Sequence, residues 1–512
     1  MLHRILFAAL LVVGTAVSRL PLQAFSLLGP FDAAYQTPDL GYGVNIIINS
    51  QATDLGGPMN LEEEYRWQSP ILVYGFDTTF VEYFGPQGIA AIESAVKVIN
   101  DLPKVSSLSP TLGEYPLETL RYNYTAQQLR IIDLKSLALS VFMQQMGLAS
   151  AERYAYTLRS RIVDADGTAN YTVISRNFDP VPVNPTAPPS QWRYTYSPYV
   201  NSTLYTYGIR HFRARNGLPE FWDAQDIALD VGNPKVTVAS YAGLQAGLVD
   251  PRVYNQFYGA ALTPGAGLFF TGLTRDDVGA LRYLLHPSRT NAEGAPLNAT
   301  RGAAVTSPTV VFNAQGTPWQ IYVPIGVTVT NANGGGGGGG TNVIPLIDPA
   351  HRAGVDKVNL VRLDVDSFLG RFLDPLIVRY SETVWDPLTR RLVTQGVERR
   401  LAQPDILFTA ADLGVSPVGG FPYVFSRQLG FVDNSALNTG GINVAAGPGT
   451  LQPGQVTFNK LGPWSININE TPEERGFRGY VFGSFDGTTN APIVFPQGVD
   501  AFELERRLYG SN

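Results

Sequence analysis

The chain has 512 residues, no cysteine, a formal net charge of −6 and only 16% charged residues. The missing cysteine excludes disulfides, thiol nucleophiles and thiolate metal ligands. The negative charge is spread along the chain with no basic stripe, which excludes the electrostatic surface that nucleic-acid binding needs. A hydrophobic content of 44% at this length is ample for a large core and for two or three domains.

The first 24 residues have the features of a secretory signal peptide. A short positive head precedes the apolar run Ile5–Val17, and Leu22-Gln23-Ala24 ends on a small residue that suits signal-peptidase cleavage. The run is shorter than the roughly 20 residues that a membrane-spanning helix needs. A buried N-terminal core helix is the alternative, and the following Pro21 argues against it. We therefore expect the mature chain to start near Phe25 and to work outside the cytoplasm.

The segment up to residue 150 predicts strands followed by helices. Val44–Ile48 and Ile71–Gly75 are apolar runs typical of strands. Gln87–Asp101 carries apolar residues three and four positions apart, which predicts an amphipathic helix that begins after Pro86. Thr125–Met146 predicts a second helical region, and Gly147 stands where a C-terminal cap belongs. Both helices should pack on the same core.

The next segment alternates between strand and loop signals before a third helix. Tyr154–Val163 alternates with period two and is followed by the turn Asp164–Gly167 and by Tyr171–Ile174, which together predict a hairpin. Residues 179–200 are rich in Pro and Tyr and indicate an ordered loop or cross-connection. Leu273–Leu285 predicts a helix with Thr274 as its N-cap.

Seven consecutive glycines, Gly334–Gly340, interrupt the chain. Glycine loses the most conformational freedom on folding, and no Lys-Ser/Thr of a phosphate loop follows, so we interpret residues 331–342 as a flexible loop or linker. The region after it predicts strands and a charged terminal helix or tail. The strands are Lys357–Asp364, Leu376–Trp385, Arg391–Arg400, Trp464–Ile468 and Tyr480–Phe482, and the tail is Phe502–Tyr509.

These elements predict an α+β fold. We expect a signal peptide over residues 1–24 and an N-terminal α+β domain over 25–330, with three main helices packed on a sheet. The linker at 331–342 then leads to a β-rich domain over 343–512.

Histidine-based chemistry finds no support in the sequence. Beyond the signal peptide the only histidines are His211, His286 and His351, which are far apart. A helical zinc site needs two imidazoles one turn apart, and no pair here has that spacing. No Gly-x-Ser-x-Gly elbow is present, so a Ser-His-Asp triad is unsupported. We expect no metal site and no cofactor, and no catalytic residue can be assigned.

The acidic clusters are the second set of candidate catalytic residues, because glycosidases use two carboxyl groups. Glu62-Glu63-Glu64 and Asp276-Asp277 are consecutive acids of the kind that are usually solvated, the second pair in a first helical turn that favours carboxylates. In a strand, Asp364 and Asp366 would share one side, where a cation or proton site is an alternative to solvation. Asp164–Gly167 lacks the further oxygen ligands of a calcium loop and is expected to be a turn.

Aromatic residues are concentrated in Trp192–Tyr199. Their rings suit packing of an extended, Pro-rich segment onto a domain, and the alternative is stacking on sugars.

The order of elements resembles that of the matrixin-type zinc peptidases of the metzincin group. The segments that carry this resemblance are the strand ending in Tyr74–Asp77, helix 87–101, helix 134–147 and the late helix Leu273–Leu285. In that family the second helix carries His-Glu-x-x-His-x-x-Gly-x-x-His, whose glutamate is the general base. With Gly147 at the glycine of the motif, Ser140, Gln144 and Ser150 stand at the ligand positions and Val141 at the base. The resemblance implies a degenerate scaffold without metal, to which no catalytic residue carries over.

Two classes of function remain open. The first is an exported, noncatalytic protein with a structural, adhesive or surface-assembly role, whose partners would be further copies of itself or a cell-surface polysaccharide. The second is an extracellular hydrolase, either a carboxylate-based glycosidase or a catalytically dead metzincin-like peptidase scaffold. Absent catalytic motifs and low charge favour the first, and an exported chain without cysteine favours a bacterial periplasmic, surface or secreted protein.

Overall fold

The computed structural model describes ten stretches of the chain, apart from the single positions 349, 367, 374, 387, 388, 489, 491 and 497. These stretches are residues 24–28, 58–213, 220–230, 235–243, 265–312, 328–331, 346–414, 424–433, 448–461 and 481–499. The predicted signal peptide up to Gln23, the glycine run, the strands Val44–Ile48 and Trp464–Ile468 and the tail Phe502–Tyr509 lie outside them. The described residues form an α+β fold in which strands predominate, as the sequence predicts.

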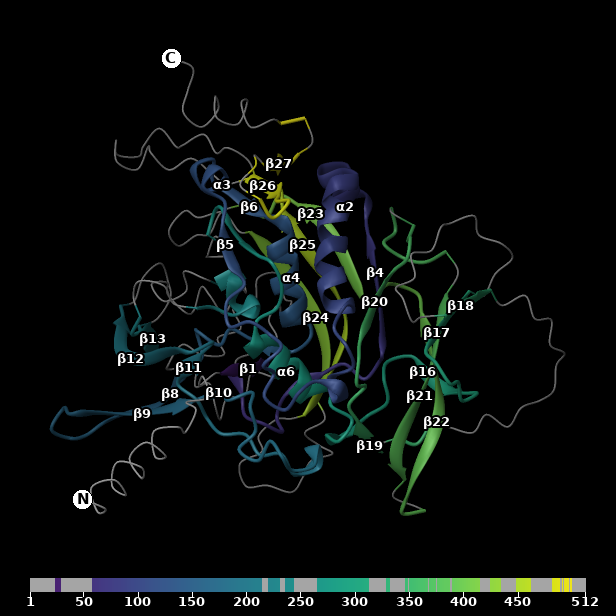
Figure 1. The fold of residues 1–512 in the computed structure, drawn as a ribbon, viewed down its shortest axis with the longest axis horizontal. Coiled ribbons are helices and arrows are strands. Elements are labelled where there is room, and N and C mark those ends of the chain that lie inside the picture. The colour runs from purple at the N-terminus through teal and green to yellow at the C-terminus, as the bar shows by residue number, and fades with distance from the viewer. Residues whose placement is uncertain are drawn as a thin grey trace, which may run out of the picture.

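A six-stranded sheet forms the centre of the fold (Figure 1). Its order is β20, β4, β23, β25 and β24, the first four parallel and β24 antiparallel, and the short β3 runs parallel to the start of β25. The bounds of these strands are Asn359–Arg362, Ile71–Phe76, Ile406–Ala411, Gly449–Asn459, Phe425–Asp433 and Tyr65–Arg66 for β3. The strands come from both sides of residues 331–342, so the two regions that the sequence separates there share one sheet.

Two helices lie side by side across one face of this sheet, α2 (Thr78–Asn100) and α4 (Leu134–Gln145) (Figure 1). The predicted helix Gln87–Asp101 is the second part of α2, which begins earlier because Asp77 caps it. The chain kinks at Gly85, whose φ of 60° is not helical, just before Pro86. The third predicted helix is α6 (Arg275–Leu285), capped by Thr274 as expected and packed beside β1 (Phe25–Leu28). No helix of the described residues is long and apolar enough to cross a membrane.

The prediction of one helical region over Thr125–Met146 is wrong. A short helix α3 (Tyr124–Gln128) is followed by the strand β6 (Ile131–Asp133) before α4 begins. Arg130 adopts a left-handed φ of 55°, which ends α3, and β6 then pairs in parallel with β26 (Val481–Ser484). This pairing across about 350 residues of chain overrides the local helical pattern.

A second sheet of seven strands covers the other face of β4 and β20 (Figure 1). Its longest pair, β21 (Leu376–Asp386) and β22 (Arg391–Leu401), confirms the predicted strands 376–385 and 391–400. Apolar side chains of β4 and β20 pack against this pair and against β17 in one buried cluster. The remaining strands of the sheet are β15 (Thr290–Glu293), β16 (Ala299–Gly302), β17 (Thr309–Phe312), β18 (Thr328–Asn331) and β19 (Ala350–Ala353).

Smaller sheets and hairpins surround this core. The predicted hairpin is present as β8 (Tyr156–Val163) and β9 (Ala169–Ser175), joined by the expected turn at Asp164–Gly167. Segment 179–200 is an ordered connection, as predicted, held by backbone hydrogen bonds across its two arms. The other strands are β2 (Pro58–Met59), β5 (Leu120–Tyr122), β7 (Leu148–Ala149), β10 (Asn177–Phe178), β11 (Tyr199–Val200), β12 (Thr203–Phe212), β13 (Phe221–Ala228), β14 (Leu268–Phe270) and β27 (Ile493–Val494).

Replacing Gly147 by alanine is expected to destabilise the fold by more than about 2 kcal/mol. Gly147 follows α4 with φ of +100°, as a helix-ending glycine does, and a Cβ there would lie 2.3 Å from the carbonyl oxygen of Tyr65. A left-handed conformation alone costs an L-residue about 1–2 kcal/mol, and the backbone clash adds to it. Gly167→Ala is the matched control, because Gly167 also has a positive φ (+87°) but no atom within 4 Å of the added Cβ. Urea unfolding of both variants measures the difference, and equal effects would contradict the clash.

Candidate functional site

The positions that the metzincin resemblance singles out are buried in structural contacts. Ser140 Oγ and Gln144 Nε2 both donate hydrogen bonds to the carbonyl oxygen of Ala239, at 3.3 and 2.9 Å. Arg427 Nη1 donates to Gln144 Oε1 at 3.4 Å, so these side chains tie the 3-10 helix η4 (Val238–Gly243) and strand β24 to α4. All of these side chains are at least nine-tenths buried, as is Ser150 in the turn after α4. Val141 lies in the hydrophobic core.

In two of the acidic clusters the expectation of solvated carboxylates holds for Glu62, which is exposed, and is wrong for the others, which are buried: Glu63, Glu64, Asp276 and Asp277. Glu64 is 1% exposed and accepts a hydrogen bond from the backbone N–H of Glu62, while Arg289 Nη2 lies 3.5 Å from its Oε1. Asp277 closes a capping box with Thr274 and also accepts from the backbone N–H groups of residues 238 and 239, both at 3.0 Å. These carboxylates hold backbone segments together and do not face a cleft.

Asp364 and Asp366 do not form the shared site that a continuous strand would give them. Strand β20 ends at Arg362, so the two residues do not alternate along a strand. Asp364 is exposed beside Arg362, at 3.5 Å, and Asp366 accepts from the backbone N–H groups of the next turn at residues 368 and 369. The strand alternation on which the idea of a shared cation site depended is therefore not present.

The three histidines serve separate local roles. His211 stacks on Trp222 with ring centroids 4.5 Å apart and bonds to Glu220 at 3.0 Å. His286 caps the end of α6 and accepts from the backbone N–H of Ser288. Burial lowers the pKa of His286. His351 is an exposed residue of β19. Among the described residues, no group of three or more acidic or histidine side chains is placed to hold a metal ion.

The aromatic segment Trp192–Tyr199 packs largely onto the protein. Tyr194 contacts Phe25 and Tyr283 edge-on, with centroids 6.2 and 5.4 Å away, and the Arg282 guanidinium lies over the Trp192 ring. Tyr196 is 59% exposed. The segment thus packs onto the protein, and among its aromatic rings only that of Tyr196 is exposed.

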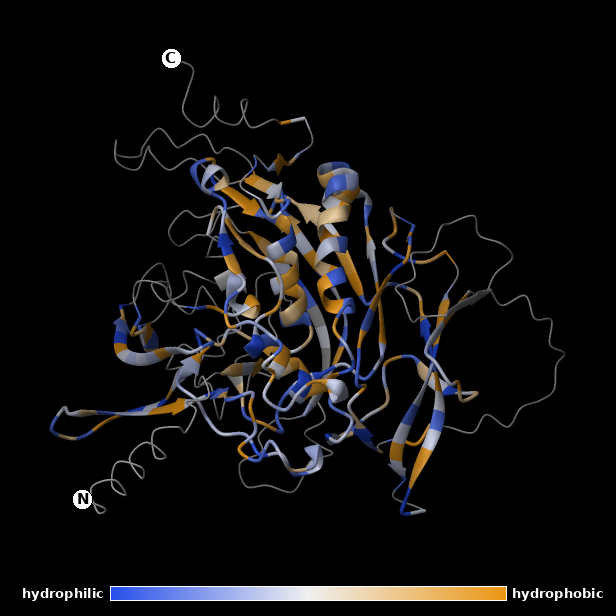
Figure 2. Cartoon of the chain, in the orientation of Figure 1, coloured by the Kyte–Doolittle hydropathy of each residue, from blue (hydrophilic) through white to orange (hydrophobic). Residues whose placement is uncertain are grey.

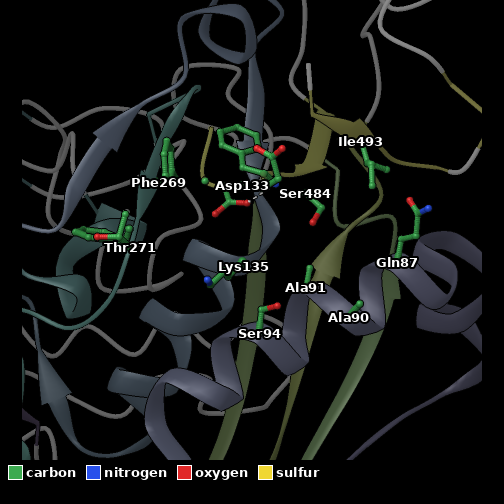
Figure 3. A pocket seen from close by; sticks show the side chains of 14 residues that line it. Gln87, Ala90, Ala91, Ser94, Asp133, Lys135, Phe269, Thr271, Ser484 and Ile493 are labelled. Atoms are coloured by element: carbon green, nitrogen blue, oxygen red, sulfur yellow. Dashed lines mark hydrogen bonds between the residues drawn. The ribbon is translucent and has the colours of Figure 1, made fainter. Parts of the chain in front are cut away.

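A pocket that no sequence pattern indicates lies where α2, α4 and two small sheets meet. Its volume is about 470 Å³, and it opens to the surface between side chains of these elements (Figure 3). Helix α2 and the start of α4 line one part, and the ends of β14 and of the β26–β27 pair line the other. The side chains are Gln87, Ala90, Ala91, Ser94, Asp133, Lys135, Phe269, Thr271, Ser484 and Ile493, with further residues between them.

Two of the ionisable groups of the pocket, Asp133 and Lys135, lie at the start of α4, and the third, Asp486, follows β26. Asp133 caps this helix, accepting from Ser136 N at 2.9 Å and Ser136 Oγ at 2.6 Å, and it also accepts from Phe485 N at 3.2 Å. Burial raises the pKa of Asp133 to about 6, although these hydrogen bonds and the charge of Lys135 act in the opposite direction. A carboxyl group with a raised pKa in a cleft is a common mark of a functional site, and here it also has a capping role.

The pocket therefore offers two carboxyl groups, those of Asp133 and Asp486, one ammonium group and several neutral donors and acceptors beside an apolar wall. Gln87, Ser94 and Ser484 supply the neutral polar groups. Ala90 and Phe269 belong to the apolar wall. Such a lining suits a small polar ligand with an apolar face. The one sequence signal that points here is Asp133, an acid just before an apolar helix.

The fold and this pocket describe an α+β protein with a polar pocket at the start of α4. No protein-family model, curated protein or solved structure matches this chain.

Proposed function

We propose that the chain is an exported, noncatalytic protein that assembles at a bacterial cell surface, by association with further copies of itself and contact with surface polysaccharide. Export is supported by the signal-like segment 1–24. A noncatalytic role is supported by the buried, structural use of Ser140, Gln144 and the acidic pair at 276 and 277. On this proposal, the resemblance to the metzincins concerns the scaffold only and does not extend to zinc peptidase activity.

The observation that carries the assembly proposal is the exposed apolar surface on two projecting hairpins. On β8–β9, Ile162 is 61% and Val163 48% exposed. On β21–β22, Leu392 is 67% and Trp385 40% exposed. Figures 1 and 2 show both hairpins reaching away from the core, with apolar stretches along them. Hairpin β8–β9 is a two-stranded ribbon with an open edge, and apolar side chains on such a ribbon are typical of surfaces that pair with another chain.

A concentration series tests this proposal. We expect the wild-type protein to associate with rising concentration in sedimentation velocity, and Ile162→Asp to weaken the association at least tenfold, because a charge is placed in an apolar contact. Val183→Asp is the matched control, since Val183 is 65% exposed but lies in the 179–200 connection. A wild-type protein that stays monomeric at high concentration, or equal weakening by both variants, would contradict self-association.

The pocket supports a cell-surface polysaccharide as the second partner. Neutral hydrogen-bonding groups next to Phe269 and alanine side chains match the alternating polar edges and apolar faces of sugar rings. Gln87 and Ser94 project from α2 toward the cavity, and Ser484 faces it from β26 (Figure 3).

An extracellular hydrolase is the second candidate function, favoured by Asp133, which lines the pocket together with the carboxyl group of Asp486. A carboxyl group with a pKa of about 6 is suited to donate a proton to a glycosidic oxygen. Release of reducing sugar from a polysaccharide, abolished in Asp133→Asn, would favour the hydrolase. Binding of the sugar without cleavage would favour the noncatalytic protein.

A further inference from the structure

An aspartate without a charged partner lies at the start of α6. Asp276 is 0% exposed. Its Oδ2 accepts hydrogen bonds from the backbone N–H groups of Ala24, at 3.1 Å, and Asn201, at 2.6 Å. Its Oδ1 is buried and has no hydrogen-bond partner. A buried carboxylate held only by amide donors is poorly compensated for its loss of hydration.

The charged neighbours that act on Asp276 in the described part of the chain are acidic. Asp277 and the half-buried Glu152 are its acidic neighbours, and burial raises the pKa of Asp276 well above its usual range, with both neighbours adding to the effect. Burial also raises the pKa of Glu152 to about 8. Within the described part of the chain, no arginine or lysine forms an ion pair with these three groups, and the nearby Arg153 pairs with Asp223 at 2.6 Å.

The residue that contacts Asp276 is itself part of the core. Ala24 is 0% exposed and packs in a cluster with Ala151, Ala155, Val200 and Tyr205. The strand that follows it, β1, pairs with β2, β7 and β10. Removing Ala24 would leave a space in this cluster and take away the N–H donor, so the geometry argues that Ala24 belongs to the folded protein.

We propose that the chain is processed to a free α-amino group at Ala24, and that this ammonium group forms a buried ion pair with Asp276. In the processing step, water cleaves the Gln23–Ala24 amide under a peptidase outside the cytoplasm, which leaves a carboxylate on Gln23 and an ammonium group on Ala24. This step rests on the proposed export. The processed end lies one residue earlier than the start near Phe25 that the signal pattern predicts.

The expected gain in stability comes from a change of the hydrogen-bond donor at Ala24, from an amide to an ammonium group, while the position of the nitrogen stays the same. The backbone nitrogen of Ala24 already lies 3.1 Å from Asp276 Oδ2. Conversion of that amide into an ammonium group turns a neutral hydrogen bond into a charge-assisted one, which is shorter and roughly twice as strong. It also places one positive charge beside three carboxyl groups in a site where solvent screens little. The ammonium group carries two further protons, and Oδ1 is an acceptor without a donor.

The pairing is tested by comparing two forms of the chain that start at Ala24, made from a cleavable fusion. One has a free amine, and the other has an acetylated amine that keeps the N–H but has no charge. We expect the free form to have an equilibrium constant of unfolding at least tenfold smaller, measured by urea denaturation. In Asp276→Asn this difference should disappear. Equal stability of the two wild-type forms would overturn the ion pair, and this comparison needs no variant that has lost its fold.

The difference in stability between the free-amine and the acetylated forms should also depend on pH, which gives a second test. An α-amino group has an ordinary pKa of about 7.7–8.0, and pairing raises it in the folded state. The advantage of the free amine is therefore lost as the pH rises through this raised pKa, and it is also lost at low pH, where protonation of Asp276 removes the carboxylate of the pair. The groups that face the pair titrate in both forms, and the charge of the free ammonium group shifts their pKa values in that form alone, so they contribute to the pH dependence of the difference. They are Asp277 and Glu152, with Asp226 and Tyr205 close to Glu152.

The processing itself is tested on the full chain. The complete sequence is expressed in a bacterial host, and the N-terminus of the protein recovered outside the cytoplasm is determined by mass spectrometry. We expect Ala24 as the first residue. A first residue of Phe25, or one upstream of Ala24, would overturn the processing site. A chain retained in the cytoplasm with residues 1–23 attached would contradict export, while a positive result for the ion pair would still stand.

Discussion

Phe408→Ala is expected to lower the free energy of unfolding by about 3–5 kcal/mol, the cost of removing a large aromatic side chain from a close-packed core. Phe408 lies in the central strand β23 and is 0% exposed. Five aromatic rings from β4, α2, α4 and β25 surround it, with centroids 5.5–6.3 Å away. The alanine variant loses contacts on every side, because these elements cannot all move inward to close the cavity.

Phe368→Ala is the matched control, since the same atoms are removed from a ring that is 88% exposed. We expect its free energy of unfolding to stay within about 0.5 kcal/mol of wild type. Urea denaturation followed by circular dichroism and tryptophan fluorescence measures both variants. A loss below about 1 kcal/mol for Phe408→Ala would show that β23 is not the centre of the core.

Arg66→Met should cost about 3–5 kcal/mol, because it leaves a carboxylate buried without its cation. Arg66 Nε and Nη2 donate to the two carboxylate oxygens of Glu293, at 2.8 and 3.2 Å, and the side chains are 2% and 0% exposed. Arg66 also donates to three backbone carbonyl groups, at residues 284, 289 and 352. The pair thus joins the central sheet to α6 and to the seven-stranded sheet.

Two further variants separate the charge effect from the loss of packing. Lys97→Met removes one partner of an ion pair whose side chains are 72% and 61% exposed, and should change stability by no more than about 1 kcal/mol. Arg66→Met combined with Glu293→Leu removes both charges and should recover much of the loss, since replacement of a whole buried pair is often close to neutral. If the double variant is as unstable as Arg66→Met alone, the lost backbone contacts outweigh the unpaired charge.

Elements with strong local signals could be predicted from the sequence. The capping box at Thr274 and Asp277 marks the start of α6 in a run of only four residues. The alternation in Tyr156–Val163 and the turn at Gly167 mark a hairpin whose partners are neighbours in the chain. In both cases the residues that stabilise the element lie next to each other, so no tertiary contact is needed to recognise it.

Elements stabilised by distant partners were predicted less well. Ile131–Asp133 has a helical pattern around it but becomes a strand because it pairs with β26, and Asp364 leaves its expected strand where β20 ends. The burial of Glu64 depends on Arg289, and that of Asp276 on Ala24 and Asn201. No local rule marks such partners, since each contact forms only after the chain has folded over hundreds of residues.

The sequence by itself determined that this is an α+β chain without thiol chemistry, with a signal-like N-terminus, three main helices and the strands of two hairpins, β8–β9 and β21–β22. Composition and periodicity suffice for these statements because they depend on residue types and on neighbours along the chain. Tertiary structure alone decided the strand order of the central sheet, the pocket around Asp133 and the contact of Ala24 with Asp276. Each of these joins segments far apart in the chain, and their positions follow from packing and burial, which local sequence does not encode.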